Sequence, residues 1–276
     1  MSNLFLSDSV PTNRVARLSA VLIPFSIDVL VSCITIAFIS IGAMLLWEIA
    51  SGVMLATQAQ QRNQRLDSQS VAILIGQPGV LVQMLVALIA IGGTALLLYF
   101  WRLPATVDER HHARLALRRM STWNCIIGVA VLTFFFSTLS GLFARKLGIS
   151  IVPSNQALIL EGLARWPLFV VLFVVFLVPA YEELLFRRVF LGRFLIAGRP
   201  ILGITLSGLA FAFLHEIPGL SSNGALAIIY LWLIYMILGM AFGWVYWRTG
   251  SLWASITTHS FNNIGALIGL YFFGMY

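Results

Sequence analysis

Charged residues are scarce in this chain, and cysteine is scarcer still. Asp, Glu, Lys and Arg make up 10% of the 276 residues, whereas about 25% is usual for a soluble domain. Hydrophobic residues make up 60%, and the mean hydropathy is +0.95. This composition excludes a soluble globular enzyme, a disordered tail and a coiled coil. The two cysteines, Cys33 and Cys125, both lie in apolar segments, which argues against a disulfide framework or a zinc finger.

The long apolar segments predict an all-α, polytopic transmembrane helical bundle, because a bilayer span needs about 20 apolar residues. The N-terminal segment shows no pattern of a cleaved secretory signal, so we expect the first span to act as the insertion signal and to remain. We expect about seven spans, at residues 18–47, 71–101, 121–143, 166–186, 201–216, 224–247 and 252–275.

The chain has 17 Lys and Arg against 10 Asp and Glu, a net charge of +7. In a soluble protein this excess would suggest nucleic-acid binding. Here the basic residues lie mostly in loops beside apolar segments, where they orient the spans, so no nucleic-acid partner is expected. With seven spans, twelve basic residues fall on the N-terminal side and five on the other. The positive-inside rule therefore predicts a cytoplasmic N-terminus, and the short loops suit a bacterial inner membrane.

An ionisable side chain at bilayer depth is costly, so each one is a candidate functional residue. Glu182 and Glu183 end the fourth apolar segment, at its expected cytoplasmic end. Glu183 and Arg187 are four residues apart and can pair on one helix face, whereas Glu182 points about 100° away. Glu182 is therefore a candidate general base, and Pro179 can kink the helix one turn earlier. The alternative is that these charges only mark a helix end at the interface.

Two histidines lie at membrane depth. His215 ends a short apolar segment, and Phe211, four residues earlier, can cover its ring. His259 and Asn263 share a helix face and can both donate to one point, as an oxyanion hole requires. The alternatives are an interfacial histidine and polar contacts between helices. We expect Asn262 to lie on a different face.

Some other features receive no catalytic role. Asp28 in the first span has no basic residue within one helical turn, so either it pairs across helices or the span begins later than residue 18. Gly239 and Gly243, like Gly265 and Gly269, have the spacing that lets helices approach closely.

These clusters resemble the motifs of the CPBP family of intramembrane proteases, also called the CAAX-protease and bacteriocin-processing (Abi) family, to which the Ras-converting enzymes belong. The family motifs EExxxR, FxxxH and HxxxN read here as Glu182-Glu183-x-x-x-Arg187, Phe211-x-x-x-His215 and His259-x-x-x-Asn263. The resemblance covers about 165–270. It implies a catalytic transmembrane core in residues 151–276, preceded in 1–150 by transmembrane helices and a basic cytoplasmic loop.

The resemblance implies an intramembrane endopeptidase of glutamic type, with no metal or cofactor. Glu182 and His215 would activate a water, and His259 and Asn263 would hold the oxyanion. The supporting residues would be Glu183, Arg187 and Phe211. Expected partners are membrane lipid and a peptide or membrane-protein substrate.

Two alternatives remain open at this point. One is a zinc-dependent protease that uses Glu182, His215 and His259 as ligands. The other is a non-enzymatic immunity or transport protein that uses the same polar cluster for binding. His215 is expected near the far end of the fifth span, so the three motifs can meet only if that helix is tilted, re-entrant or shallow.

Overall fold

The computed structural model describes residues 18–63 and 67–273, and every regular element in this part of the chain is helical. Labels with η mark π-helical turns. The elements are α1 (Ser19–Gln61), α2 (Ser68–Ile75), α3 (Val80–Ala87), η1 (Leu88–Gly92), α4 (Gly93–Arg102), α5 (Val107–Ala116), α6 (Met120–Lys146), α7 (Gln156–Arg165), α8 (Pro167–Leu172), η2 (Phe173–Leu177), α9 (Val178–Glu183), η3 (Leu184–Leu191), α10 (Gly192–Ile196), α11 (Pro200–His215), α12 (Ala225–Thr249) and α13 (Leu252–Phe273).

The polytopic all-α bundle is confirmed, but fewer helices than predicted have the length and composition of a membrane span. In the described part of the chain five do: Ser19–Gln61, Val80–Arg102, Met120–Lys146, Pro167–Ile196 and Ala225–Thr249. The fifth predicted span is α11, which has only 16 residues. The seventh is α13, which has 22 residues but carries several polar ones, including His259 and Asn262.

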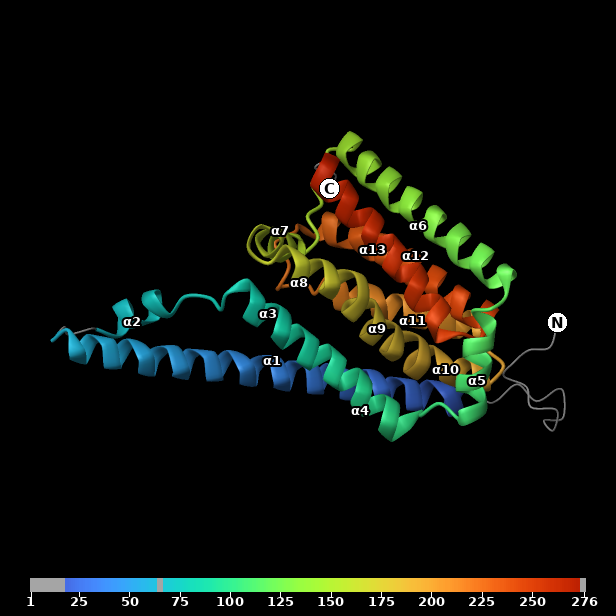
Figure 1. Cartoon of the computed structure of the whole chain (residues 1–276), viewed down its shortest axis with the longest axis horizontal. Coiled ribbons are helices and arrows are strands. Elements are labelled where there is room, and N and C mark those ends of the chain that lie inside the picture. Colours follow the sequence, from blue (N-terminus) through green and yellow to red (C-terminus); the bar gives the residue numbers. More distant parts are fainter. Residues whose placement is uncertain (1–17, 64–66, 274–276) are drawn as a thin grey trace.

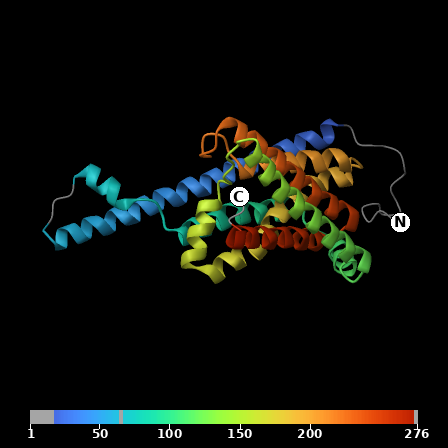
Figure 2. The ribbon, with the colours of Figure 1, turned by 90° about the horizontal axis from the view of Figure 1, so that it is seen from above.

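Several predicted boundaries were wrong. The first helix does not end near residue 47 but continues to Gln61, and its 43 residues span about 65 Å at 1.5 Å per residue. That is about twice the thickness of a hydrocarbon core, and Figures 1 and 2 show α1 projecting beyond the other helices with α2 beside it. The second span is interrupted between Ile75 and Val80, where Gly76 has a φ of +58° and Pro78 disfavours a helix.

The remaining helices form a bundle with two distinct ends. In Figure 1, α1 and α3–α4 lie on one side, α6 lies on the other, and α8–α13 lie between them. One end of the bundle carries α5 and the opposite end carries α7. Helices of the first 150 residues pack directly on the second half, since α4 contacts η3 and α6 contacts α12 and α13. The expected division into a region of residues 1–150 and a catalytic core of residues 151–276 therefore remains a prediction.

Small residues allow the close helix approaches that their spacing predicted. A Cβ placed on Gly239 of α12 would lie 3.0 Å from the Cα of Gly208 in α11. A Cβ on Gly265 of α13 would lie 2.6 Å from a ring carbon of Phe134 in α6. The helix that carries His215 thus meets α12 at nearly backbone-to-backbone distance, and the helix that carries His259 packs on the Phe134 ring.

Charged contacts hold the α5 end of the bundle together. Asp28 is fully buried and does pair across helices, with Arg102 at 2.7 Å and also with Arg193. Arg188 binds the carboxylate of Glu109 at 3.0 Å and the carbonyl oxygen of Leu103 at 3.1 Å.

Of the basic residues expected in the cytoplasm, Arg102, Arg188 and Arg193 take part in these contacts, whereas Arg187 lies inside the bundle beside Glu183. Arg14 and Arg17, which were expected on the cytoplasmic side, and Arg65, which was expected on the other side, lie outside the described residues.

Candidate functional site

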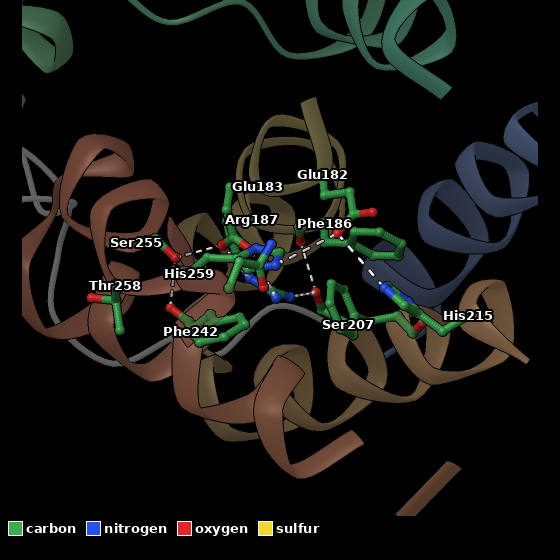
Figure 3. Close-up of polar contacts among 12 residues, drawn as sticks. Glu182, Glu183, Phe186, Arg187, Ser207, His215, Phe242, Ser255, Thr258 and His259 are labelled. Atoms are coloured by element: carbon green, nitrogen blue, oxygen red, sulfur yellow. Dashed lines mark hydrogen bonds and ion pairs between the residues drawn. The ribbon is translucent and has the colours of Figure 1, made fainter. Parts of the chain in front are cut away.

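The two adjacent glutamates lie in the middle of a long helix, not at its end. The helix Pro167–Ile196 runs ten residues past the predicted end of the fourth span. The prediction failed because Arg187 and Arg188 are buried and paired inside the bundle, so the helix does not have to stop at their charges. Since α11 is short and ends inside the bundle, His215 lies beside Glu182 (Figure 3), and the three motifs meet.

An irregular, partly π-helical segment positions the glutamates. The turn α9, which carries both, is flanked by the π-helical turns η2 and η3, and such turns occur often at functional sites. Pro179 has no N–H, so it cannot donate to the carbonyl oxygen of Val174 five residues before it. That oxygen instead accepts a hydrogen bond from the Asn263 side chain at 2.9 Å. This hydrogen bond joins the helix Pro167–Ile196 to α13.

Glu183 is the centre of a saturated polar network, shown in Figure 3. Its Oε2 accepts from Arg187 Nε at 2.8 Å and from Ser255 Oγ at 2.5 Å. Its Oε1 lies 3.0 Å from Nδ1 of His259. Arg187 in turn donates to Ser207 Oγ at 3.0 Å. Glu183 and Arg187 are both fully buried, so this ion pair locks together the helices that carry the three motifs.

Glu182 has the opposite environment. Its side chain is buried, yet its Oε2 has no hydrogen-bond partner among the described residues. This oxygen lies 3.9 Å from Nε2 of His215 and 3.9 Å from Nε2 of His259. These distances are too long for direct hydrogen bonds and leave Glu182 available for a further partner.

The ring of His215 is fixed in orientation. Its Nδ1 lies 2.8 Å from the carbonyl oxygen of Phe211, and since a carbonyl can only accept, Nδ1 carries the proton. In the neutral ring, Nε2 therefore has a lone pair directed towards Glu182. The rings of Phe211 and Tyr235 flank the imidazole, with centroids 4.2 and 4.5 Å from its own.

His259 is oriented by Glu183. The carboxylate accepts from Nδ1, and the ring stacks on Phe242 with centroids 4.6 Å apart. Sequence reasoning missed Ser255, although its place four residues before His259 puts it on the same helix face. It also missed Phe242, Tyr235 and Ser207, whose positions follow no motif.

Asn262 and Asn263 both line the cavity described below, although successive residues of α13 lie on different faces of the helix. The amide nitrogen of Asn263 is already bonded to Val174, which leaves one N–H for another partner. Asn262 is 7% exposed, and its Oδ1 has no partner within the part of the chain that the structure describes.

A cavity of about 440 Å³ reaches these side chains. It extends from the middle of the bundle, at Phe242 and His259, to the end nearest α7, where Ser154, Gln156 and Ile159 line it. Apolar residues such as Phe173, Leu231 and Leu238 dominate the wall. Glu182, His215 and His259 provide polar groups in this largely apolar lining.

The site does not fit a metal ion as it stands. Across residues 18–63 and 67–273, no group of three or more His, Cys, Asp and Glu side chains is arranged to hold one. The oxygen of Glu182 is 3.9 Å from each imidazole nitrogen, whereas ligands of a tetrahedral zinc lie about 3.3 Å apart.

A buried carboxylate facing two imidazoles at the wall of a largely apolar cavity is suited to hydrolysis within a membrane bundle. Residues 164–265 match the family described as Type II CAAX prenyl endopeptidase Rce1-like. This match supports a peptide hydrolase of the CAAX-protease (CPBP) family, and the protein is an integral multi-pass membrane protein. No curated protein and no solved structure matches the chain.

Proposed function

We propose that this protein is a glutamic-type intramembrane endopeptidase that uses Glu182 and His215 to activate water. The observation that carries the proposal is the gap of 3.9 Å between Glu182 Oε2 and His215 Nε2. Both atoms are hydrogen-bond acceptors when His215 is neutral, and a water molecule has two protons to donate. A water at about 2.8 Å from each atom would bridge them.

In the proposed reaction, the water oxygen attacks the carbonyl carbon of the scissile peptide bond while Glu182 accepts a proton. His259, whose Nδ1 is bonded to Glu183, supplies an Nε2–H to the developing oxyanion when both ring nitrogens carry a proton. The remaining N–H of Asn263 is the second donor. The C–N bond then breaks as Glu182 returns the proton to the leaving nitrogen.

The substrate we propose is a peptide or membrane protein in contact with the bilayer, because apolar residues dominate the cavity wall. We also propose a bacterial inner membrane with the basic α5 end in the cytoplasm, on the positive-inside rule. The cavity then lies in the half of the bundle on the other side of the membrane.

The test compares membranes from cells that contain wild-type protein with membranes that contain Glu182→Gln at equal expression. Released peptides are identified by mass spectrometry. We expect fragments that occur only with the wild type, and their ends define the cleavage site. Identical peptide profiles would contradict the endopeptidase and favour a binding or transport role for the cluster.

A second comparison tests the metal-independent mechanism. Purified wild-type protein is treated with a zinc chelator and assayed on a peptide that spans the identified cleavage site. We expect the rate to stay unchanged, because Glu182 and His215 activate the water without a metal. A loss of activity that added zinc restores would instead support the zinc-dependent alternative.

A further inference from the structure

Glu216 directly follows His215, and its carboxylate is fully buried. Its Oε1 accepts from the main-chain N–H of Ser154 at 2.8 Å, and its Oε2 accepts from Ser154 Oγ at 2.7 Å. Asn223 Nδ2 lies 3.4 Å from the same Oε2. The partner residues belong to the loop before α7 and the loop before α12, so this carboxylate joins two segments to the end of α11.

Asn223 strengthens the same junction. Its Oδ1 accepts from the main-chain N–H of Val152 at 3.1 Å, and its Nδ2 donates to the carbonyl oxygen of Val152 at 2.7 Å. One side-chain amide thus satisfies both main-chain polar groups of that residue. We call Glu216, Asn223, Val152 and Ser154 the Glu216 clamp.

The clamped segment forms one wall of the cavity that contains Glu182. Ile151, Pro153 and Ser154 line this cavity. Val152, between them, is 44% exposed on the outside of the molecule. The segment is therefore a thin wall at the α7 end, and its place depends on side-chain hydrogen bonds because it belongs to no helix.

The clamp does not orient the imidazole beside it. The ring of His215 is held by the carbonyl of Phe211 and by the ring of Tyr235. Glu216 continues the chain beyond α11, with its N–H on the carbonyl oxygen of Ala212 and its own carbonyl oxygen on Trp232 Nε1. Loss of the carboxylate should therefore move the wall and leave the reacting groups in place.

We propose that Glu216 is a positioning residue for substrate binding. It holds residues 151–154 against the end of α11, so that the cavity keeps the shape in which a peptide reaches Glu182. This role rests on the proposed endopeptidase function.

The kinetic test uses full-length protein in lipid nanodiscs and a fluorogenic peptide that spans the cleavage site found with wild-type membranes. Glu216→Leu and Asn223→Ala weaken the clamp from two sides. We expect each variant to raise KM about tenfold and to leave kcat within about threefold, which is the pattern of lost binding rather than lost chemistry. Glu216→Gln, which keeps one acceptor oxygen, should restore much of the affinity.

The matched control is Glu161→Leu. Glu161 is an exposed residue of α7 that pairs with Arg165 on the surface, so its loss should change neither constant. A thermal unfolding curve for each variant separates a folding defect from a binding defect. If Glu216→Leu fails to fold, Asn223→Ala alone is used to test the clamp.

Amide hydrogen exchange gives a readout that does not depend on hydrolysis. We expect exchange at residues 151–154 to accelerate about tenfold in Glu216→Leu and to stay unchanged in Glu161→Leu. Unchanged exchange in Glu216→Leu would overturn the clamp.

Faster exchange with an unchanged KM would overturn its role in substrate binding but leave the proposed function intact. A fall in kcat alone would also overturn that role, because it would place Glu216 in the chemical step. Wild-type membranes with no fragments beyond those of Glu182→Gln would overturn both the proposed function and this inference.

Discussion

Glu182 and Glu183 are neighbours in sequence, and both face His259, but their carboxylates have opposite environments. Glu183 binds a guanidinium, a hydroxyl and an imidazole, and it is saturated. Glu182 Oε2 has no hydrogen bond within the described residues and faces two imidazole nitrogens. The first arrangement stabilises the bundle, whereas the second leaves a base free to react.

This difference predicts opposite effects of the same substitution. Glu182→Gln removes no hydrogen bond recorded for Oε2, so thermal unfolding should shift little while hydrolysis falls by about 100-fold or more. Glu183→Gln leaves Arg187 with a neutral partner in a buried site, so the free energy of unfolding should fall by about 3–5 kcal/mol. Thermal unfolding of the purified variants in one detergent measures this contrast. Equal losses of stability would contradict the assignment of roles.

Asn262 supplies a second prediction at this scale. A buried amide oxygen without a partner costs about 1–3 kcal/mol, and leucine has nearly the same shape as asparagine. Asn262→Leu should therefore raise the melting temperature, by a few degrees at this size. Asn263→Leu is the matched comparison and should lower the melting temperature, because it removes the bond to Val174. A lower melting temperature in Asn262→Leu would show that its oxygen has a partner.

Residue spacing predicted the contacts within one helix and missed most of those between helices. The four-residue intervals gave the Glu183–Arg187 pair and the cover of His215 by Phe211, and both are observed. The bond between Glu183 and His259 depends on how two helices pack. The bond from Asn263 to Val174 depends on a π-helical turn beside Pro179, which hydropathy does not reveal.

At the scale of elements, hydropathy located all seven apolar segments but not their ends. A window of apolar residues cannot show that Arg187 and Arg188 are buried, so the fourth helix was predicted ten residues too short. It also cannot show that α1 continues through Gln58 and Gln61 beyond the apolar run. The short length of α11 was predicted correctly, and this length places His215 at the depth of Glu182.

Close packing of α11 on α12 is a contact between elements that is sensitive to added volume. A Cβ on Gly208 would lie 2.9 Å from the carbonyl oxygen of Met236, and backbone cannot move aside cheaply. Gly208→Ala should therefore lower the melting temperature.

The control for this prediction is Gly128→Ala in α6, where a Cβ would meet nothing within 4 Å. That change should stabilise the protein by up to about 1 kcal/mol, because alanine is the better helix former. Thermal unfolding in detergent ranks the two variants. Gly208→Ala with a melting temperature at or above that of the wild type would show that these helices do not pack as described.

At the scale of the whole molecule, charge and cavity lie at opposite ends. The basic helix α5 and the ion pairs of Asp28 and Arg188 occupy one end of the bundle. The cavity occupies the half nearest α7, behind the wall held by the Glu216 clamp. Lys and Arg are retained on the cytoplasmic side of a membrane. The arrangement therefore predicts that a substrate reaches Glu182 from the half of the membrane away from the cytoplasm.

Single cysteines measure this orientation. Cys33 and Cys125 are first replaced by alanine, and His112→Cys in α5 or Glu161→Cys in α7 is then introduced; both positions are exposed. A maleimide that does not cross membranes should label Glu161→Cys in intact cells, and His112→Cys only after permeabilisation. The cysteine-free protein is the control. The reverse pattern would place the cavity half of the bundle at the cytoplasmic face and the basic α5 end outside. The substrate would then reach Glu182 from the cytoplasm.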